Sequence, residues 1–171
     1  MRCFPQKERS IMAKKQVKSF LKFGNFIAAA LAILAVLTIF LPAVKVDGTE
    51  NTTYTGLQAA FGYSESALGV TTQIFNFSFL TFLAYLLPIA GVVLSLLNRK
   101  GTSTLFSFLS AGCYIVGAVF MFLAAGNIAF ADSVLGKAAS LLTYVLTPWS
   151  IIGGVLLCLS GLVSLANVFL K

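Results

Sequence analysis

The chain has 171 residues, of which 58% are apolar and 10% are charged, and it carries a net charge of +7 with no histidine. Soluble domains are roughly 45–50% apolar and about 25% charged. The composition excludes a disordered chain, a coiled coil, a collagen-like repeat and a disulfide-rich secreted module, and one soluble core could not bury so much apolar surface. It indicates a polytopic membrane protein.

Four apolar stretches are each long enough to cross a hydrocarbon layer about 30 Å thick, which takes roughly 20 helical residues. None alternates apolar and polar residues as the strands of an outer-membrane barrel would. Their only charged residues, Lys22 and Lys171, lie at an end, where a long side chain can reach the membrane surface. We therefore expect an all-α membrane protein, an antiparallel four-transmembrane-helix bundle with a small extracellular hairpin/helix cap.

The expected segments follow in chain order. They are a basic cytoplasmic N-terminal segment (1–19), span one (20–42), a first extracellular segment (43–74), span two (75–97), a cytoplasmic turn (98–103), span three (104–125), a second extracellular segment (126–148) and span four with the C-terminus (149–171). Ten of the twelve basic residues lie on the side of the termini and the turn, with Glu8 as the only acidic residue there. Because Lys and Arg gather on the cytoplasmic side of membrane proteins, both termini are expected in the cytoplasm.

The N-terminal region leaves two alternatives open. Residues 1–43 could be a cleaved signal peptide, but the apolar region of such a peptide is usually about 7–15 residues and this one is about twenty, so a retained helix is our interpretation. Met12 opens a sequence typical of a start, so residues 1–11 are either a tail or not native. Residues 14–23 fit a short helix on an anionic membrane surface or a charge cluster that only sets the topology.

Each expected span carries a stripe of small or polar residues at alternating steps of three and four. In lipid, apolar burial does not drive helices together, so close packing of such residues and a few polar contacts must do so. We expect the stripes to face the interior and the large Phe, Leu and Ile residues to face lipid. The stripes are Asn25, Ala28, Ala32 and Ala35; Thr81, Ala84, Pro88, Gly91, Ser95 and Asn98; Ser103, Ser107, Ser110, Tyr114 and Gly117; and Ser150, Gly153, Leu157, Ser160, Ser164 and Asn167.

The first extracellular segment begins with a pattern typical of a β-hairpin. Asp47-Gly48 is a strong signal for a two-residue turn, which would place Lys45 opposite Glu50 as a favourable charge pair. A short helix is expected next, seated on the rim of the bundle through three apolar residues: Leu57, Ala60 and Phe61. A cap of hairpin and helix is the prediction, and an irregular loop is the alternative.

The second extracellular segment has apolar residues at helical spacing. These are Val134, Leu135, Ala138, Leu141, Leu142, Val145 and Leu146, and the polar positions between them are Ser133, Lys137 and Ser140. Asp132 or Ser133 could cap this helix, and Thr147 could cap span four with Pro148 at its first position. We expect an amphipathic helix along the outer membrane interface that leads into span four near Trp149, either as a partner-docking or lipid-contacting ridge or as a lid on the bundle.

The sequence shows no constellation of catalytic residues. Without histidine there is no imidazole base and no zinc site of the common type, and the cysteines Cys3, Cys113 and Cys158 form no CxxC pair. No ionisable residue lies in the middle of a span, where it would mark a transport path or a proton relay. We therefore expect no enzyme activity, no cofactor and no metal. A lipid-active enzyme would have to draw on the outer acidic residues Asp47, Glu50, Glu65 and Asp132.

Two features of the sequence bear on the surface of the protein: the distribution of its basic residues and a glycosylation sequon. The basic residues are spread over a tail and a short turn, so nucleic-acid binding is not expected. Asn51-Thr52-Thr53 matches the glycosylation sequon on the predicted outer side, although so short a motif also occurs by chance.

The layout resembles that of the claudin-type tetraspan proteins, with inward termini, a longer first outer segment with strand character, a short inner turn and a second outer segment that enters a Gly-rich fourth helix. The portions that carry the likeness are FLPAVKVDG, the GLQ at Gly56 to Gln58 and TPWSIIGGVLL from Thr147. The Trp and the paired cysteines of the first outer segment of claudins are missing. Small tetraspan proteins of an uncharacterised Gram-positive bacterial family are similar as well, and this resemblance implies a location in the plasma membrane.

These observations favour a non-enzymatic multi-pass membrane protein that acts by association with a membrane or extracellular partner, as an accessory subunit, a scaffold or an immunity-type protein. Its partners would be the lipid bilayer and another membrane protein or a second copy of the chain. The alternative is a channel or transporter for a neutral or lipid-like solute, alone or as an oligomer. The candidate partner-binding residues are Tyr54, Gln58, Phe61, Tyr63 and Tyr144.

Overall fold

The computed structural model describes residues 23–48, 52–67, 70–98 and 104–169. Four helices in this part are long and apolar enough to cross a membrane: the N-terminal span Phe23–Phe40, α3 (Phe79–Leu97), α4 (Thr104–Phe122) and α6 (Pro148–Phe169). The last turn of the N-terminal span is the 3-10 helix η1 (Thr38–Phe40). The coarser part of the expected fold, four apolar helices and a small part with strands, is confirmed.

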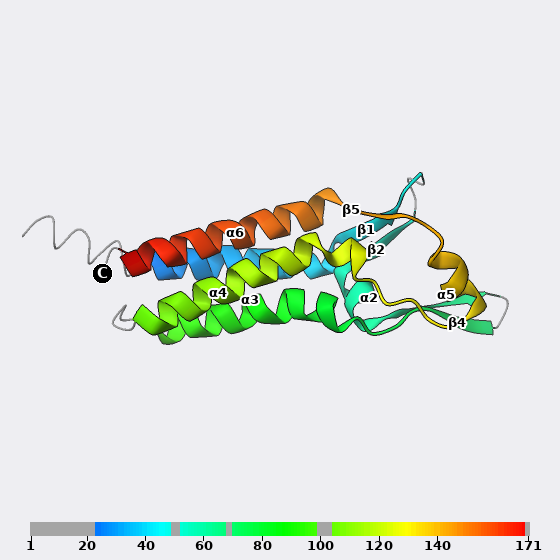
Figure 1. Cartoon of the computed structure of the whole chain (residues 1–171), viewed down its shortest axis with the longest axis horizontal. Helices are drawn as coiled ribbons and strands as arrows, with labels where there is room; N and C mark the ends of the chain where they lie inside the picture. Colours follow the sequence, from blue (N-terminus) through cyan, green and yellow to red (C-terminus); the bar gives the residue numbers. More distant parts are fainter. Residues whose placement is uncertain (1–22, 49–51, 68–69, 99–103, 170–171) are drawn as a thin grey trace, which may run out of the picture.

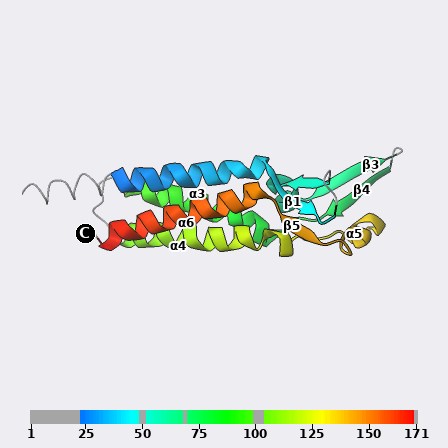
Figure 2. The ribbon, with the colours of Figure 1, turned by 90° about the horizontal axis from the view of Figure 1, so that it is seen from above.

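The four helices lie side by side, and the strands gather beyond one end of them (Figures 1 and 2). The start of the N-terminal span and the end of α6 lie together at the other end. The charged residues expected at that end, which include Arg99, Lys100 and Lys171, lie outside the described residues, as does the proposed helix at 14–23 up to residue 22.

The expected stripes face the interior of the helical part. Every stripe residue in the described part is buried, while large apolar residues off the stripes, such as Phe26, Leu97 and Leu105, are exposed. Ser103, the first residue of the third stripe, lies outside the described residues. The prediction of which helix faces turn inward is therefore confirmed.

Helices α3 and α4 approach each other at two glycines. A Cβ atom on Gly91 would lie 2.6 Å from the ring of Tyr114, and one on Gly117 would lie 2.8 and 2.9 Å from two ring atoms of Pro88. All three distances are shorter than those that a real Cβ atom makes with a neighbouring carbon atom. The ring of each partner therefore occupies the space where a larger residue would carry its side chain.

A polar layer joins all four helices near the chain ends. Asn167 Nδ2 donates a hydrogen bond to Asn25 Oδ1 at 2.9 Å, and Asn98 Nδ2 donates to Ser107 Oγ at 2.7 Å. The layer is completed by the hydroxyls of Ser110 and Ser164, which lie 2.8 Å apart, and of Ser95, which donates to the Asn25 carbonyl at 3.0 Å. Such contacts are among the few attractive forces between helices in lipid.

Both outer segments contribute to one antiparallel sheet of three strands, in the order β2-β1-β5. Strand β1 (Pro42–Val46) pairs with β2 (Thr53–Thr55) on one side and with β5 (Tyr144–Leu146) on the other. Strands β3 (Tyr63–Ala67) and β4 (Val70–Phe75) form a second pair. An isolated bridge between Phe75 and Phe130 connects β4 to the second outer segment.

The predicted hairpin exists, but its register differs from the prediction. Lys45 lies opposite Thr53, and Val46 N donates to Thr52 O at 3.1 Å, so the connection is longer than the two residues Asp47-Gly48. Gly48 has a φ of 80°, which suits a turn. The expected partner of Lys45, Glu50, lies outside the described residues, as does Asn51 of the sequon.

The short helix expected after the hairpin is α2 (Gly56–Phe61). Thr55 and Gln58 form a capping box at its start, in which the Thr55 side chain accepts from Gln58 N and the Gln58 side chain accepts from Thr55 N. The buried residues are Gly56, Ala59 and Ala60, so of the three residues expected to seat the helix only Ala60 faces inward. Leu57 and Phe61 are exposed, because only small side chains fit against α3 and η1.

The second outer segment corrects the expectation of one long interfacial helix. Helix α5 covers only Val134–Ala139, with the Ser133 side chain accepting from Gly136 N as its cap, and Tyr144–Leu146 form β5 instead. Helix α5 lies at the end of the strands farthest from the long helices, so it does not lie beside their ends (Figure 1). The apolar spacing beyond Ala139 belongs to a turn and a strand that is fixed by its pairing with β1.

The bounds of the helices differ by a few residues from those of the expected spans, and the starts of α3 and α6 are informative. Helix α3 begins at Phe79 rather than at Phe75, because Ile74 and Phe75 belong to β4. Helix α6 begins at Pro148, as the pattern predicts for a first helical residue, and the Thr147 hydroxyl before it donates to the Pro42 carbonyl.

Replacement of Gly117 by alanine tests the close approach of α3 and α4. The new methyl group would overlap the rigid ring of Pro88, so we expect a loss of stability of about 1–3 kcal/mol. The matched control is Gly112→Ala in the same helix, where a Cβ meets nothing within 4 Å, so stability should be unchanged or slightly raised. Thermal unfolding in detergent, followed by circular dichroism, measures both. Equal melting temperatures for the two variants would contradict the packing.

Candidate functional site

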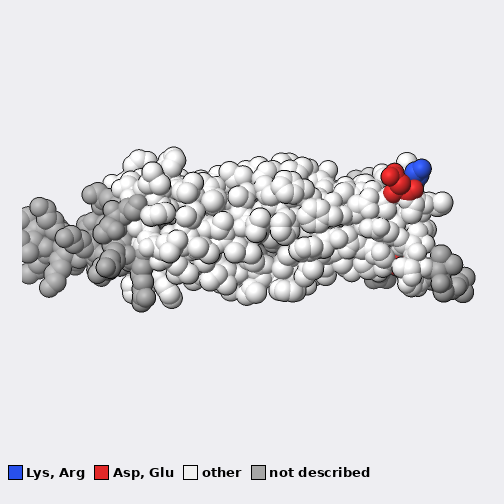
Figure 3. Space-filling view, turned by 90° about the horizontal axis from the view of Figure 1, so that it is seen from below, with Lys and Arg blue, Asp and Glu red and all other residues white. Residues whose placement is uncertain are grey.

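The strand-containing part, here called the cap, comprises the described residues of 42–78 and 124–147. The long helices carry no charged residue within their described bounds, and all the charged residues that the structure describes lie in the cap: Lys45, Asp47, Glu65, Asp132 and Lys137. Figure 3 shows acidic and basic atoms only at the end of the molecule far from the helices, apart from the atoms drawn in grey. The cap is thus the part suited to water and to polar contacts.

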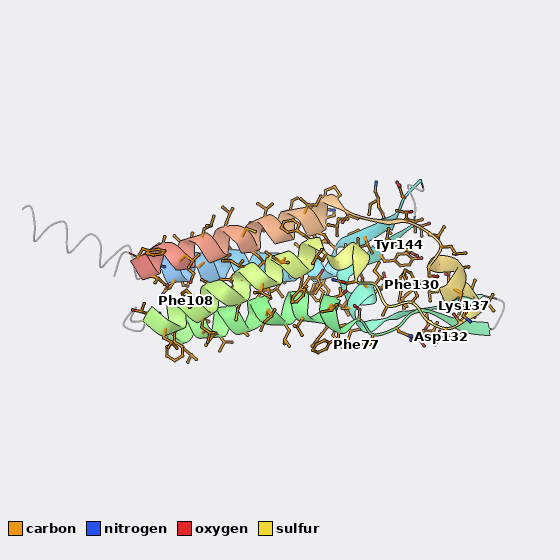
Figure 4. The ribbon with its side chains drawn as sticks, in the orientation of Figure 1. Phe77, Phe108, Phe130, Asp132, Lys137 and Tyr144 are labelled. Atoms are coloured by element: carbon orange, nitrogen blue, oxygen red, sulfur yellow. The ribbon has the colours of Figure 1, made fainter. Side chains whose placement is uncertain are left out.

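Five aromatic rings pack together inside the cap. The ring of Tyr54 lies 4.7 Å from that of Phe75, 5.7 Å from that of Tyr63 and 6.4 Å from that of Tyr144, between centroids. Phe130 closes the cluster against Phe75 at 5.8 Å and Tyr144 at 5.5 Å (Figure 4). Such edge-to-face and tilted pairs stabilise a fold beyond their buried area.

The cluster joins four strands and the segment before α5. Tyr54, Tyr63, Phe75 and Tyr144 come from β2, β3, β4 and β5, and Phe130 precedes α5. Beneath the rings, Val44, Ile74 and Ile128 are buried and continue the apolar core of the cap. The cluster therefore connects the two sheets.

Two of the phenol groups in this cluster, those of Tyr54 and Tyr144, have a raised pKa. Burial raises the pKa of the Tyr54 phenol above the ordinary 10.0, and the nearby Glu65 and Tyr63 raise it further. The pKa of Tyr144 is raised for the same first reason, with a smaller effect from Tyr54. The Tyr144 hydroxyl is buried and has no hydrogen-bond partner in the part of the chain described.

Three of the five candidate residues, Tyr54, Tyr63 and Tyr144, are brought together in this cluster. Gln58 is engaged in the capping box of α2, so its side-chain oxygen has a structural partner. Phe61 lies apart, against Phe77 and Phe82. The structure thus brings together the three tyrosines and places Phe61 in a separate aromatic group.

Sequence reasoning missed Phe75 and Phe130. The apolar run that follows Phe75 places this residue at the start of the expected span two. Phe130 lies in the expected second extracellular segment, before the residues with helical spacing. The only signal for their pairing is the strand character of the sequence before Asn76, which the apolar run masks.

An exposed apolar surface, here called the tip patch, lies on and after α5. Val134 is 84% exposed and Leu141 is 87% exposed, and Leu135 and Leu142 are exposed beside them. Asp132 and Lys137 flank the patch, at the end of the cap seen in Figure 4. Four of the apolar residues expected on the amphipathic helix are therefore exposed.

The helical interior is closed by apolar contacts between the polar layer and the cap. Ala32, Tyr114, Ala118 and Leu157 are fully buried there, and Met121 is nearly so. Within residues 23–48, 52–67, 70–98 and 104–169 no three His, Cys, Asp or Glu residues are grouped so that they could hold a metal ion.

Comparison with known proteins adds no family. No family model matches the chain, and no curated protein is significantly similar to it. The resemblance to claudins thus has no support beyond the layout of the chain.

Substitutions at Tyr144 separate the ring from the hydroxyl. Tyr144→Phe removes a buried hydroxyl that has no partner in the described part, so we expect stability to be unchanged or raised by up to about 1 kcal/mol. Tyr144→Ala removes the ring contacts to Tyr54, Phe75 and Phe130, and we expect a loss of about 2–4 kcal/mol. Limited proteolysis of the cap in detergent reports both effects. A Phe variant as labile as the Ala variant would show that the hydroxyl has a partner.

Proposed function

We propose that the chain is a multi-pass protein of the plasma membrane in which the four long helices form an antiparallel transmembrane bundle and the cap lies outside the cell. The outer faces of the helices are apolar, while the stripes of small and polar residues are buried. The helices have 18 to 22 residues, close to the roughly 20 that a bilayer core requires. Trp149 is exposed at the cap end of α6, where membrane proteins place aromatic anchors.

The charge distribution supports an orientation with both termini in the cytoplasm. The sequence places ten of its twelve basic residues beside the termini and the turn between α3 and α4. The cap carries acidic as well as basic residues. The rule that Lys and Arg remain on the cytoplasmic side then puts the cap on the outer side.

Cysteine accessibility tests this orientation. In a chain with Cys3, Cys113 and Cys158 replaced by serine, Lys45→Cys, at an exposed residue of the cap outside the tip patch, should react with an impermeant maleimide added to intact cells. Phe169→Cys, at a residue that is 85% exposed at the opposite end, should react only after the membrane is opened. The reverse pattern would contradict the orientation. Labelling of neither site after the membrane is opened would show that the two sites do not suit the assay, and Asp47→Cys would then replace Lys45→Cys.

The proposed function is association, without catalysis, with another membrane protein or with a second copy of the chain. The observation that carries it is the tip patch, because Val134 and Leu141 are almost fully exposed at the end of the cap that also carries Asp132 and Lys137. Exposed contiguous apolar side chains outside a membrane mark sites of interaction. The closed helical interior favours this function over a pore through a single chain.

The association is tested by the mass of the complex after extraction in a mild detergent. We expect the wild-type chain to run as an assembly larger than its own 18.2 kDa, and the double variant Val134→Ser/Leu141→Ser to lose the additional mass. The matched control is Ile152→Ser/Val155→Ser, which changes exposed residues of α6 away from the cap. A wild-type chain that runs as a monomer would contradict association.

The alternative function, a channel or transporter for a neutral or lipid-like solute, predicts a different measurement. Vesicles that contain the purified chain should then leak the solute faster than empty vesicles. Association alone predicts no leak above the empty vesicles.

A further inference from the structure

A second exposed apolar surface runs from α3 to α2, and we call it the rim patch. The ring of Phe61, the last residue of α2, lies 5.5 Å from that of Phe82 in α3 and 6.2 Å from that of Phe77 in the connecting segment. Phe77 and Phe82 are 5.6 Å apart. Phe61 is 52% exposed and Phe77 is 49% exposed, and Figure 4 shows Phe77 projecting away from the ribbon where α3 meets the cap.

The rim patch is held rigidly against the long helices. The capping box of Thr55 and Gln58 fixes the start of α2, and a Cβ on Gly56 would overlap the Tyr85 hydroxyl of α3. At its end, Ser78 N donates to Ala60 O at 2.9 Å. Because Gly56, Ala59 and Ala60 face inward, Leu57 and Phe61 point outward one helical turn apart.

The surroundings of the rim patch suit lipid better than water. Phe61 contacts Phe82 directly, so the patch is continuous with the apolar side of α3. Neither residues 52–64 nor residues 71–82 contain a charged residue. The tip patch differs in both respects, because Asp132 and Lys137 flank it and it lies at the far end of the cap (Figure 4).

We propose that the rim patch lies in the outer leaflet of the bilayer, with Leu57, Phe61 and Phe77 at the boundary between lipid headgroups and acyl chains. Short helices with one apolar face bind membranes in this way, through their buried apolar area. Helix α2 then anchors the base of the cap to the membrane surface, beyond the end of α3. This inference rests on the transmembrane arrangement proposed above.

The depth of single tryptophans tests the inference. Trp149 is the only tryptophan, so Trp149→Phe provides a silent background. Phe61→Trp, Ile89→Trp and Leu141→Trp are then placed separately in the rim patch, the middle of α3 and the tip patch. Each variant is reconstituted in phosphatidylcholine vesicles whose acyl chains carry bromine at a shallow or a deep position, since bromine quenches tryptophan fluorescence on contact.

We expect Phe61→Trp to lose more fluorescence with shallow than with deep bromine, Ile89→Trp to show the opposite order, and Leu141→Trp to be quenched by neither. If Phe61→Trp behaves like Leu141→Trp while Ile89→Trp is quenched, the rim patch faces water or a protein, and the inference is wrong although the helices span the membrane. If Ile89→Trp also escapes quenching, the transmembrane arrangement itself is wrong. Phe77→Trp repeats the measurement from a second residue of the patch.

Discussion

The structure depends on close contacts between small residues of one long helix and the side chains of its neighbours. Within lipid, burial of apolar area offers no gain when two helices meet, so the helices must approach closely enough for dispersion contacts and a few hydrogen bonds to hold them. Helix α6 shows this along its length: a Cβ on Gly153, Gly154 or Gly161 would lie 2.6 to 2.8 Å from a side-chain atom of a neighbouring helix. The polar layer also fixes how the helices are aligned, because the hydrogen bonds of each Asn side chain require a partner at a specific position.

The cap is an extension of these helix ends and is fixed by them. The Thr147 hydroxyl donates to Pro42 O, Thr147 N donates to Ala43 O at 3.0 Å, and Ser150 Oγ donates to Ala43 O at 2.9 Å. These bonds attach the start of α6 to the first residues of β1. Strand β5, which directly precedes α6, is thereby brought alongside β1. The helix packing therefore determines which strands can pair.

The inward faces of the helices could be predicted from the sequence because an α-helix has a period of 3.6 residues. In lipid, small residues at the helix–helix contacts let the helices approach closely. The pairing of the strands in the cap could not be predicted from the sequence. Val44 lies opposite Leu146, about a hundred residues away, and no local pattern specifies such a partner. The apolar run Leu141 to Leu146 fits a helix and a buried strand alike, so spacing alone gave the wrong element.

The candidate site shows the same division between local and non-local information. Tyr54, Tyr63 and Tyr144 could be selected as outer aromatic residues, but their assembly around Phe75 follows from strand pairing, which the sequence does not display. Gln58 has a structural role that a local signal in the sequence also indicates. A Thr followed three residues later by Gln is the signature of a capping box, and Thr55 and Gln58 form this box at the start of α2.

The two exposed apolar surfaces of the cap can serve different partners because they lie at different distances from the long helices. Leu57 and Phe61 continue the surface of α3, whereas Val134 and Leu141 lie beyond the aromatic cluster. The Phe75–Phe130 bridge connects β4 to the segment that leads into α5, so the tip is joined to the bundle through packed rings and not through a free loop. In the arrangement that we propose, a partner bound at the tip is held at a fixed distance from the long helices. Since neither surface contributes to the buried core, substitutions on them should alter binding while the fold is retained.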